Sequence, residues 1–355
     1  MTLTRVVSRP LRLLPWLLAF ALLYWVARTV SLADVWQLVQ QLSPNEIFLL
    51  VLANVIVLTT LNGRWWLTLY GQGHTIPFWD LFRYRLAAFG LSYITPGPHF
   101  GGEPLQVYFV EKAHNVPRAT AVSALTLDKL LELIVNFAFM LIGILLIVQW
   151  QTGLGGVEVV SPLVGITAVF LLALPLLLLL ALWRGHQPLT TFFRLWQKLP
   201  LWQRLGWQAG YEQFLQTIAD SETQVTQFCR RSPLILFAAF GCSLLSWLAM
   251  LAEYWLMLAF LGSPLTLIQL AVTLTAARIA ILLLIPGAVG ALEASQMVAF
   301  GAIGLNPAVG IGASLLIRMR DVGLAVLGLW WGWEQIRETN PSETSKALEQ
   351  SRKVL

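Results

Sequence analysis

Long apolar segments are the feature that most restricts what this chain can fold into. A segment of about 20 mostly apolar residues is long enough to cross the hydrocarbon core of a bilayer as an α-helix. The chain of 355 residues is 57% hydrophobic and only 12% charged, about half the charged share of a typical soluble domain. We therefore predict an all-α polytopic membrane protein with six full spans, at residues 11–30, 46–70, 119–150, 157–183, 233–261 and 307–333.

Two further segments, residues 75–113 and 265–304, each consist of an apolar arm, a Pro-Gly break and a shorter arm. Each is predicted to be a re-entrant helical hairpin that enters and leaves the membrane on the same side. With both segments re-entrant, the basic segments all lie on one side, as the positive-inside rule requires of the cytoplasm. These segments are the N-terminus, the turn with Lys112 and Arg118, residues 184–231 and the tail. We expect a multi-pass protein of the cell (inner) membrane with both termini cytoplasmic.

The whole chain, residues 1–355, is predicted to form a single membrane domain. Residues 184–231 are basic and rich in tryptophan but too few for a second domain. They favour an amphipathic interfacial helix on the anionic inner leaflet, with a solvated loop as the alternative. Residues 334–355 carry balanced charge and are predicted to be a cytoplasmic tail.

An internal repeat relates the two broken segments. One constant shift along the chain, without gaps, places Pro96 on Pro286, Gly97 on Gly287, Glu103 on Glu293, Gln106 on Gln296, Pro117 on Pro307 and, upstream, Trp65 on Trp255. Three predicted full spans separate the two motifs, and an odd number turns the second copy over. We predict an inverted-topology repeat, with repeat one at about residues 46–150 and repeat two at about 233–335.

An interrupted helix inside a membrane is energetically unfavourable, because hydrocarbon offers no hydrogen-bond partner for a free N–H or C=O group. Breaks are tolerated where they line a polar cavity or are buried in protein, and the helix ends that they expose suit a charged headgroup or an ion. A plain helix kink is the alternative. The predicted break residues are Pro96, Gly97, Gly101, Gly102, Pro286 and Gly287.

Ionisable residues within the predicted spans mark a candidate site. They are Asp128, Lys129, Glu132, Arg318, Arg320 and Asp321, with Glu253 in the span 233–261, and they are joined by Glu103, Glu293 and Arg278 in the two broken segments. A charge at the bilayer centre costs roughly 2.5–3.5 kcal/mol on insertion scales, so these groups should face one another or water. One interpretation is a structural network that pairs Asp128 or Glu132 with Arg318. The other is a cavity in which Arg318, Arg320 and Lys129 hold a phosphate while the acids balance charge or bind an amine. The two interpretations are compatible with each other.

The usual signatures of soluble catalysis are absent from the sequence. It contains no GxSxG, HExxH, CxxC or P-loop motif, and its four histidines form no metal-binding pattern. His99 is interpreted as a hydrogen-bonding residue rather than a proton carrier. Cys229 and Cys242 are expected to be free thiols. We expect no cofactor, no metal and no nucleic-acid partner.

The runs PGPHFGGEPLQ and NVPRATAVSALTLDKLLEL, with PGAVGALEA and GLNPAVGIGASLLIRMRD later in the chain, resemble the lysylphosphatidylglycerol synthase transmembrane region, a flippase-like family. The resemblance implies a membrane domain that moves a phospholipid between leaflets. It also implies that Glu103, Glu293, Arg318, Arg320 and Asp321 line the lipid site. Two-domain members add a cytosolic aminoacyltransferase, whereas this chain ends about 20 residues after its last predicted span. We therefore expect no lipid synthesis here, and a separate lipid-modifying enzyme is a candidate partner.

Four functions remain open at this point. The resemblance favours a flippase or lipid transporter. The alternatives are an ion- or proton-coupled small-molecule transporter, an integral-membrane transferase with Glu103 or Asp128 as base, and a non-catalytic partner subunit.

Overall fold

In a computed structural model of the chain, the described residues are 36–37, 40–95, 101–153, 162–197, 210–282, 285 and 288–339. All regular structure in these ranges is helical, as predicted, and the predicted first span at 11–30 lies outside them. The helices are α3 (Pro44–Tyr70), α4 (Phe78–Ile94), α5 (Glu103–His114), α6 (Arg118–Gly153), α7 (Pro162–Arg184), α8 (Pro188–Gln197), α10 (Tyr211–Arg231), α11 (Pro233–Phe260), α12 (Leu267–Leu282), α13 (Ala291–Ala302) and α14 (Pro307–Thr339).

Four helices in the described part of the chain are long and apolar enough to cross a membrane. They are α3, α6, α7 and α11, and each coincides with a predicted span. Helix α14, where another span was predicted, has 33 residues but is less apolar, because Arg318, Arg320 and Asp321 lie within it. The chain is therefore an all-helical membrane protein over its described residues.

Both broken segments have the predicted sequence of arm, break and shorter arm. Helix α4 has 17 residues and packs against α5, which has 12. Helix α12 has 16 residues and packs against α13, also with 12. We call these the first and the second broken pair. Pro96, Gly97, Pro286 and Gly287 lie outside the described residues.

Glycine is required where the first break meets α5. Gly101 has φ of 136°, a conformation that side-chain-bearing residues rarely adopt. Gly102 follows it and lies against α4, where an added Cβ would collide with the backbone carbonyl of Ala88. The Gly-Gly sequence therefore lets the first residue of α5 approach the backbone of α4.

Helices α3 to α6 and α11 to α14 follow the same plan. Helices α3 and α11 both begin with a proline directly after a serine, Ser43 in the first copy and Ser232 in the second. The indole of Trp66 donates to the carbonyl of Ile76, and that of Trp255 donates to Leu265. The two serines and the two tryptophans are separated by the same number of residues. This separation is one residue less than the predicted shift, which places Glu103 on Glu293. Trp255 therefore corresponds to Trp66, and the predicted overlay with Trp65 is wrong by one residue.

The offset changes at the breaks. Glu103 and Glu293 both lie in the first turn of the second arm. Their separation equals the predicted shift, which is one residue longer than the offset from Trp66 to Trp255. The second copy therefore contains one more residue between Trp255 and Glu293 than the first contains between Trp66 and Glu103. A comparison without gaps cannot detect such an insertion.

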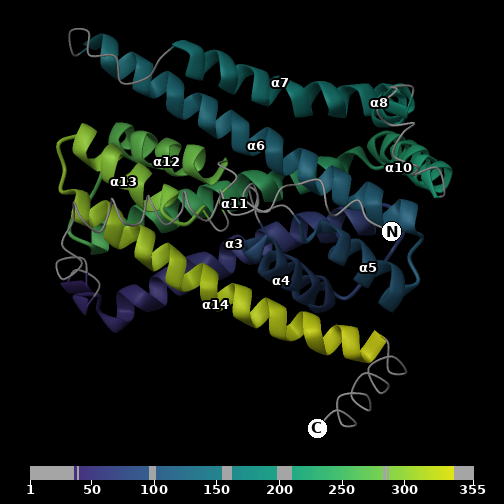
Figure 1. Cartoon of the computed structure of the whole chain (residues 1–355), viewed down its shortest axis with the longest axis horizontal. Coiled ribbons are helices and arrows are strands. Elements are labelled where there is room, and N and C mark those ends of the chain that lie inside the picture. Colours follow the sequence, from purple (N-terminus) through teal and green to yellow (C-terminus); the bar gives the residue numbers. More distant parts are fainter. Residues whose placement is uncertain are drawn as a thin grey trace, which may run out of the picture.

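The two copies contact each other reciprocally (Figure 1). Helix α3 packs along α11 in the middle of the molecule, while α4 packs on α14 and its counterpart α12 packs on α6. The first broken pair lies toward one end of the long helices, and the second lies toward the other end. Helices α7 and α10 pack on the outer side of α6, and α8 packs against α10 and α7.

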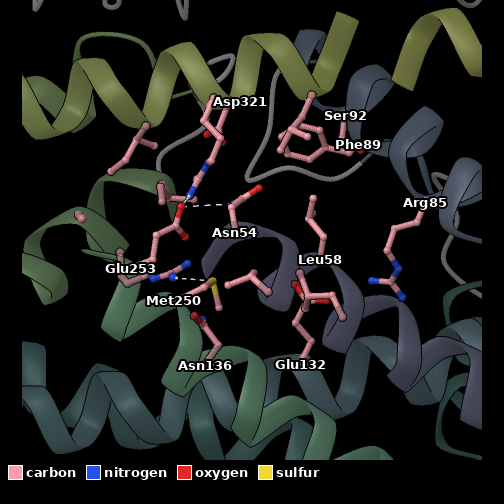
Figure 2. A pocket seen from close by; sticks show the side chains of 18 of the residues that line it. Asn54, Leu58, Arg85, Phe89, Ser92, Glu132, Asn136, Met250, Glu253 and Asp321 are labelled. Carbon is pink, nitrogen blue, oxygen red and sulfur yellow. Dashed lines mark hydrogen bonds and ion pairs between the residues drawn. The ribbon is translucent and has the colours of Figure 1, made fainter. Parts of the chain in front are cut away.

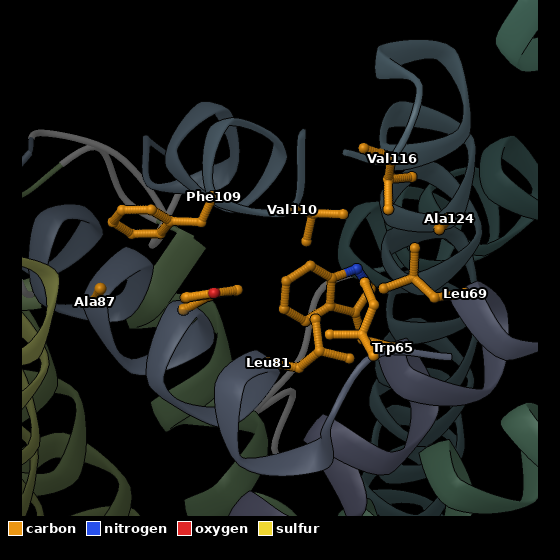
Figure 3. Close-up of a cluster of buried hydrophobic side chains, with 11 residues drawn as sticks. Trp65, Leu69, Leu81, Ala87, Phe109, Val110, Val116 and Ala124 are labelled. Atoms are coloured by element: carbon orange, nitrogen blue, oxygen red, sulfur yellow. The ribbon is translucent and has the colours of Figure 1, made fainter. Parts of the chain in front are cut away.

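A buried apolar cluster joins the first broken pair to α3 and α6 (Figure 3). Trp65 shares this cluster with side chains from all four helices and from the α5–α6 connection: Leu69, Leu81, Ala87, Phe109, Val110, Val116 and Ala124. On the other side of α4, an added Cβ at Gly328 of α14 would collide with the carbonyl of Leu86. Small residues at such contacts allow membrane helices to approach closely.

The segment predicted to be amphipathic, residues 184–231, contains α8 and α10, while residues 198–209 lie outside the described part. Buried Glu222 of α10 holds the start of α8. Its carboxylate accepts hydrogen bonds from the backbone N–H of Leu189 (2.7 Å), the backbone N–H of Thr190 (3.1 Å) and the Thr190 hydroxyl (2.5 Å). Helix α8 exposes Phe192, Leu195 and Trp196 on its outer face.

Candidate functional site

A cavity of about 380 Å³ lies between the two copies and is lined by all eight of their helices, α3 to α6 and α11 to α14. Figure 2 shows Glu253 and Arg85 on opposite sides of it. Its wall is mainly apolar and also contains a set of polar side chains: Asn54, Arg85, Ser92, Glu103, Gln106, Lys129, Glu132, Asn136, Glu253, Arg278, Arg320 and Asp321.

Opposite charges alternate along one side of the cavity. Asp128 of α6 is fully buried behind the wall and accepts hydrogen bonds from Arg64 of α3 (2.7 Å) and Arg85 of α4 (2.9 Å). Arg64 also binds Glu132 (2.8 Å). Lys129 then lies between Glu132 (3.5 Å) and Glu103 of α5 (3.4 Å). These ion pairs join four helices, and each charge has a partner of opposite sign.

A second group of charges lies where α11 meets α14. Arg320 contacts Glu253 at 2.7 Å and its neighbour Asp321 at 2.8 Å. The amide of Asn54, on α3, donates to the same carboxylate oxygen of Glu253 at 3.4 Å. The guanidinium of Arg320 is thereby held between two carboxylates at the cavity wall.

The acids at the two breaks have the same local role. Glu103 accepts a hydrogen bond from the backbone N–H of Gly101 (2.7 Å), and Glu293 accepts one from Gly290 (2.9 Å). Each acid thus satisfies a free N–H group at the start of its helix. Each is also paired with a cation on the long helix that follows, Glu103 with Lys129 and Glu293 with Arg318.

The structure brings five of the eight predicted site residues to the cavity wall: Glu103, Lys129, Glu132, Arg320 and Asp321. Asp128 lies behind the wall, and Glu293 and Arg318 are not part of the wall. The predicted pairing of Asp128 or Glu132 with Arg318 is wrong, because Arg64 and Arg85 are their partners instead. His99 lies outside the described residues.

Arg64 and Arg85 are the site residues that sequence reasoning missed. Arg64 lies inside the predicted span 46–70, where a buried cation needs an acidic partner, and this was the available signal. Its side chain is only 1% exposed. Arg85 additionally lies over the Trp65 ring, at 5.5 Å from the ring centroid.

Arg278 of α12 differs from the other cations of the wall. Its guanidinium lies over the ring of Trp247, 4.4 Å from the centroid, and one nitrogen donates to the sulfur of Met250 at 3.4 Å. No described carboxylate lies within 4.0 Å of its nitrogens. Among the described residues, no three His, Cys, Asp or Glu side chains are grouped so that they could hold a metal ion.

Comparison with known proteins connects this architecture to a family. Residues 12–348 match the family described as "Lysylphosphatidylglycerol synthase TM region". The chain belongs to this family. Members of the lysylphosphatidylglycerol synthase TM region family are membrane proteins, as the four apolar helices independently indicate for this chain.

Two archaeal proteins are also similar to the chain. UPF0104 membrane protein PH1989 of Pyrococcus horikoshii is 24% identical over 313 residues, which cover 85% of this chain and 89% of the relative. UPF0104 membrane protein MJ1595 of Methanocaldococcus jannaschii is 21% identical over 125 residues, 35% of this chain and 37% of the relative. The first alignment is long enough that it must include parts of both copies of the four-helix plan.

Proposed function

We propose that this protein moves a phospholipid between bilayer leaflets through the cavity at the interface of its two copies. The observation that carries the proposal is the cavity wall, where charged side chains from both copies converge inside an apolar bundle. Its lining cations are Arg85, Lys129, Arg278 and Arg320, and its lining acids are Glu103, Glu132, Glu253 and Asp321. A polar headgroup needs such a path, whereas acyl chains can remain in the lipid.

The lengths of the broken helices support a re-entrant topology. Helices α4 and α5 are roughly 25 Å and 18 Å long at 1.5 Å per residue, and α12 and α13 are similar. Each arm is therefore shorter than the ~30 Å core of a bilayer. In the proposed arrangement, both broken pairs re-enter the membrane, and six full spans complete the domain.

The two copies are proposed to be inverted repeats. Reciprocal packing, α4 on α14 and α12 on α6, is the pattern that a two-fold axis produces. Broken pairs at opposite ends of the long helices are expected of copies that have opposite membrane orientation. Two such copies can open the cavity alternately toward each leaflet.

The proposed membrane location and orientation follow from the distribution of charged residues along the chain. We propose a cell (inner) membrane location with cytoplasmic termini, because the basic segments then share the cytoplasmic side. In this proposal the protein is a transporter rather than an enzyme, with a membrane phospholipid as its cargo and a separate lipid-modifying enzyme as a candidate partner.

Leaflet transfer of a fluorescent phospholipid tests the proposal. Purified protein is reconstituted into phosphatidylcholine vesicles that contain a trace of headgroup-labelled phosphatidylglycerol, and dithionite bleaches the label that reaches the outer leaflet. We expect Glu103→Gln and Arg320→Gln to slow transfer about tenfold, equivalent to roughly 1.4 kcal/mol in the barrier. Arg83→Gln, which removes an exposed cation outside the cavity, should leave transfer unchanged. Equal rates in wild-type and empty vesicles would refute lipid transfer.

The lining acids also support a second function, ion- or proton-coupled transport of a small molecule. In that case a soluble solute would enter vesicles only when a proton gradient is imposed. The same vesicles without labelled lipid distinguish this function from lipid transfer.

A further inference from the structure

Each broken pair contributes one arginine to the cavity from its first arm, Arg85 from α4 and Arg278 from α12. At the offset that relates Trp66 to Trp255, Arg85 corresponds to Leu274, and Arg278 corresponds to Phe89. These four residues all line the cavity. The arginine and the apolar residue, one helical turn apart, have therefore exchanged places between the two copies.

The two arginines differ in their partners. The guanidinium of Arg85 binds the buried carboxylate of Asp128 at 2.9 Å. Arg278 contacts the Trp247 ring and the Met250 sulfur, and in the described part of the chain no acid lies within 4.0 Å of it. It is the lining cation without a carboxylate partner among the described residues, since Lys129 and Arg320 each have two.

The position of Arg278 leaves its hydrogen-bonding edge available. A guanidinium over an aromatic ring is held by its face, while its N–H groups point outward in the guanidinium plane. Sulfur is only a weak acceptor for one of them. Trp247 is itself fixed, because its ring stacks on Phe139 at 4.9 Å with an interplanar angle of 10°. A planar donor group on a rigid support is suited to two oxygens of a phosphate.

We propose that Arg278 is the residue that binds the phosphate of the cargo. This inference rests on the proposed function and specifies its site: an oxyanion of the phosphate class contacts α12, on the opposite copy from Arg85. Either a phospholipid headgroup or free phosphate has this chemistry, and the test separates the two sources.

Binding is measured on intact protein in detergent by native mass spectrometry. The probes are dioleoylphosphatidylglycerol and dioleoylglycerol, which lacks the phosphate. We expect wild-type protein to prefer the phospholipid, and Arg278→Gln to reduce that preference about tenfold, the factor that one charge-assisted hydrogen bond supplies. Arg83→Gln, with the same loss of charge on the outer surface of α4, should keep the preference. An unchanged preference in Arg278→Gln would overturn the proposal.

Wild-type protein provides a second readout that does not depend on the folding of a variant. Phenylglyoxal modifies accessible arginines, and digestion followed by mass spectrometry reports the modification of Arg278. Dioleoylphosphatidylglycerol should slow this modification, and dioleoylglycerol should not. Equal protection by both lipids would contradict a phosphate contact.

Inorganic phosphate identifies the source of the oxyanion. Protection of Arg278 by the phospholipid but not by inorganic phosphate supports a lipid headgroup, whereas protection by both supports a site for free phosphate as well. Phosphate-dependent protection in a protein that transfers no lipid would retain the Arg278 site and reject the flippase. Lipid transfer without phosphate-dependent protection would retain the flippase and reject the Arg278 site.

Discussion

Arg64 of α3 and Glu253 of α11 occupy corresponding positions in the two copies, at the offset that relates Trp66 to Trp255, and carry opposite charges. Arg64 donates to the hydroxyl of Ser243 at 3.1 Å, and Glu253 accepts from the amide of Asn54 at 3.4 Å. Asn54 and Ser243 correspond at the same offset. The two hydrogen bonds are thus copies of one contact across the α3–α11 interface, with the charge reversed. This reversal allows Arg64 to neutralise acids on α6 while Glu253 neutralises Arg320 on α14.

The buried pair of Arg64 and Asp128 should dominate stability in the first copy. Arg64→Met leaves the carboxylate of Asp128 buried and only partly compensated, so we expect the free energy of unfolding to fall by about 3–5 kcal/mol. Unfolding in mixed detergent micelles, followed by tryptophan fluorescence, measures the change. Arg118→Met removes a cation from the exposed pair with Glu111 and should cost about 1 kcal/mol or less. Equal effects of the two substitutions would contradict this account.

Gly102→Ala should distort the junction between the first break and α5. The new Cβ would collide with the backbone of Ala88, which cannot rotate away as a side chain can. We expect a loss of about 1–3 kcal/mol in unfolding free energy. Gly301→Ala is the matched control, since nothing lies within 4 Å of a Cβ built at that helical position. A thermal unfolding midpoint equal to that of the control would show that the contact is not tight.

Glu222→Gln should loosen α8 from α10. Glutamine retains one acceptor oxygen, whereas Glu222 uses both of its oxygens on Leu189 and Thr190. We expect a loss of about 1–3 kcal/mol locally, as for hydrogen bonds to a charged group. Amide hydrogen exchange at residues 189–193 should accelerate while exchange in α3 stays constant. Glu212→Gln, at an exposed position of the same helix, should leave exchange in α8 unaltered.

Cys229 should react slowly with alkylating agents in the folded protein. Burial raises the pKa of its thiol to about 11, from an ordinary value of 9.0. Two pKa units reduce the thiolate population about 100-fold at neutral pH, and the thiolate is the reactive form. Because the folded-state pKa is raised, the protonated thiol of Cys229 contributes to the free energy of unfolding. This contribution is fully present below pH 9 and is lost as the pH rises toward 11. Iodoacetamide labelling of Cys242→Ser protein, folded and denatured, measures the effect. Equal rates would show that the thiol is accessible.

Sequence reasoning predicted much of the fold because the bilayer imposes a simple length rule. The helices α3, α6, α7 and α11 lie where apolar windows of sufficient length occur, and the Pro-Gly sequences separate α4 from α5 and α12 from α13. The free state of both cysteines was also predicted correctly. These features depend on local composition, which the sequence displays directly.

The partners of the charges could not be predicted in the same way. Asp128 could reach any cation on a neighbouring helix, and its choice of Arg64 and Arg85 depends on α3 packing beside α6 and on α4 packing beside α3. The pairing of Trp255 with Trp66 was missed because an insertion lies between the compared segments. Both errors concern spatial neighbours, which only the packed helices determine.

The two broken pairs of helices also differ in how many of their arms are joined to a neighbouring helix by an ion pair. In the first, α4 and α5 are fastened to consecutive residues of α6, through Arg85 on Asp128 and Glu103 on Lys129. In the second, α13 is fastened to α14 through Glu293 and Arg318, whereas Arg278, the one charged residue of α12, has no carboxylate within 4.0 Å among the described residues. The first pair should therefore travel with α6 as a rigid body. Helix α12 can tilt without separating opposite charges, so in the proposed transport cycle we expect it to move more freely than α4.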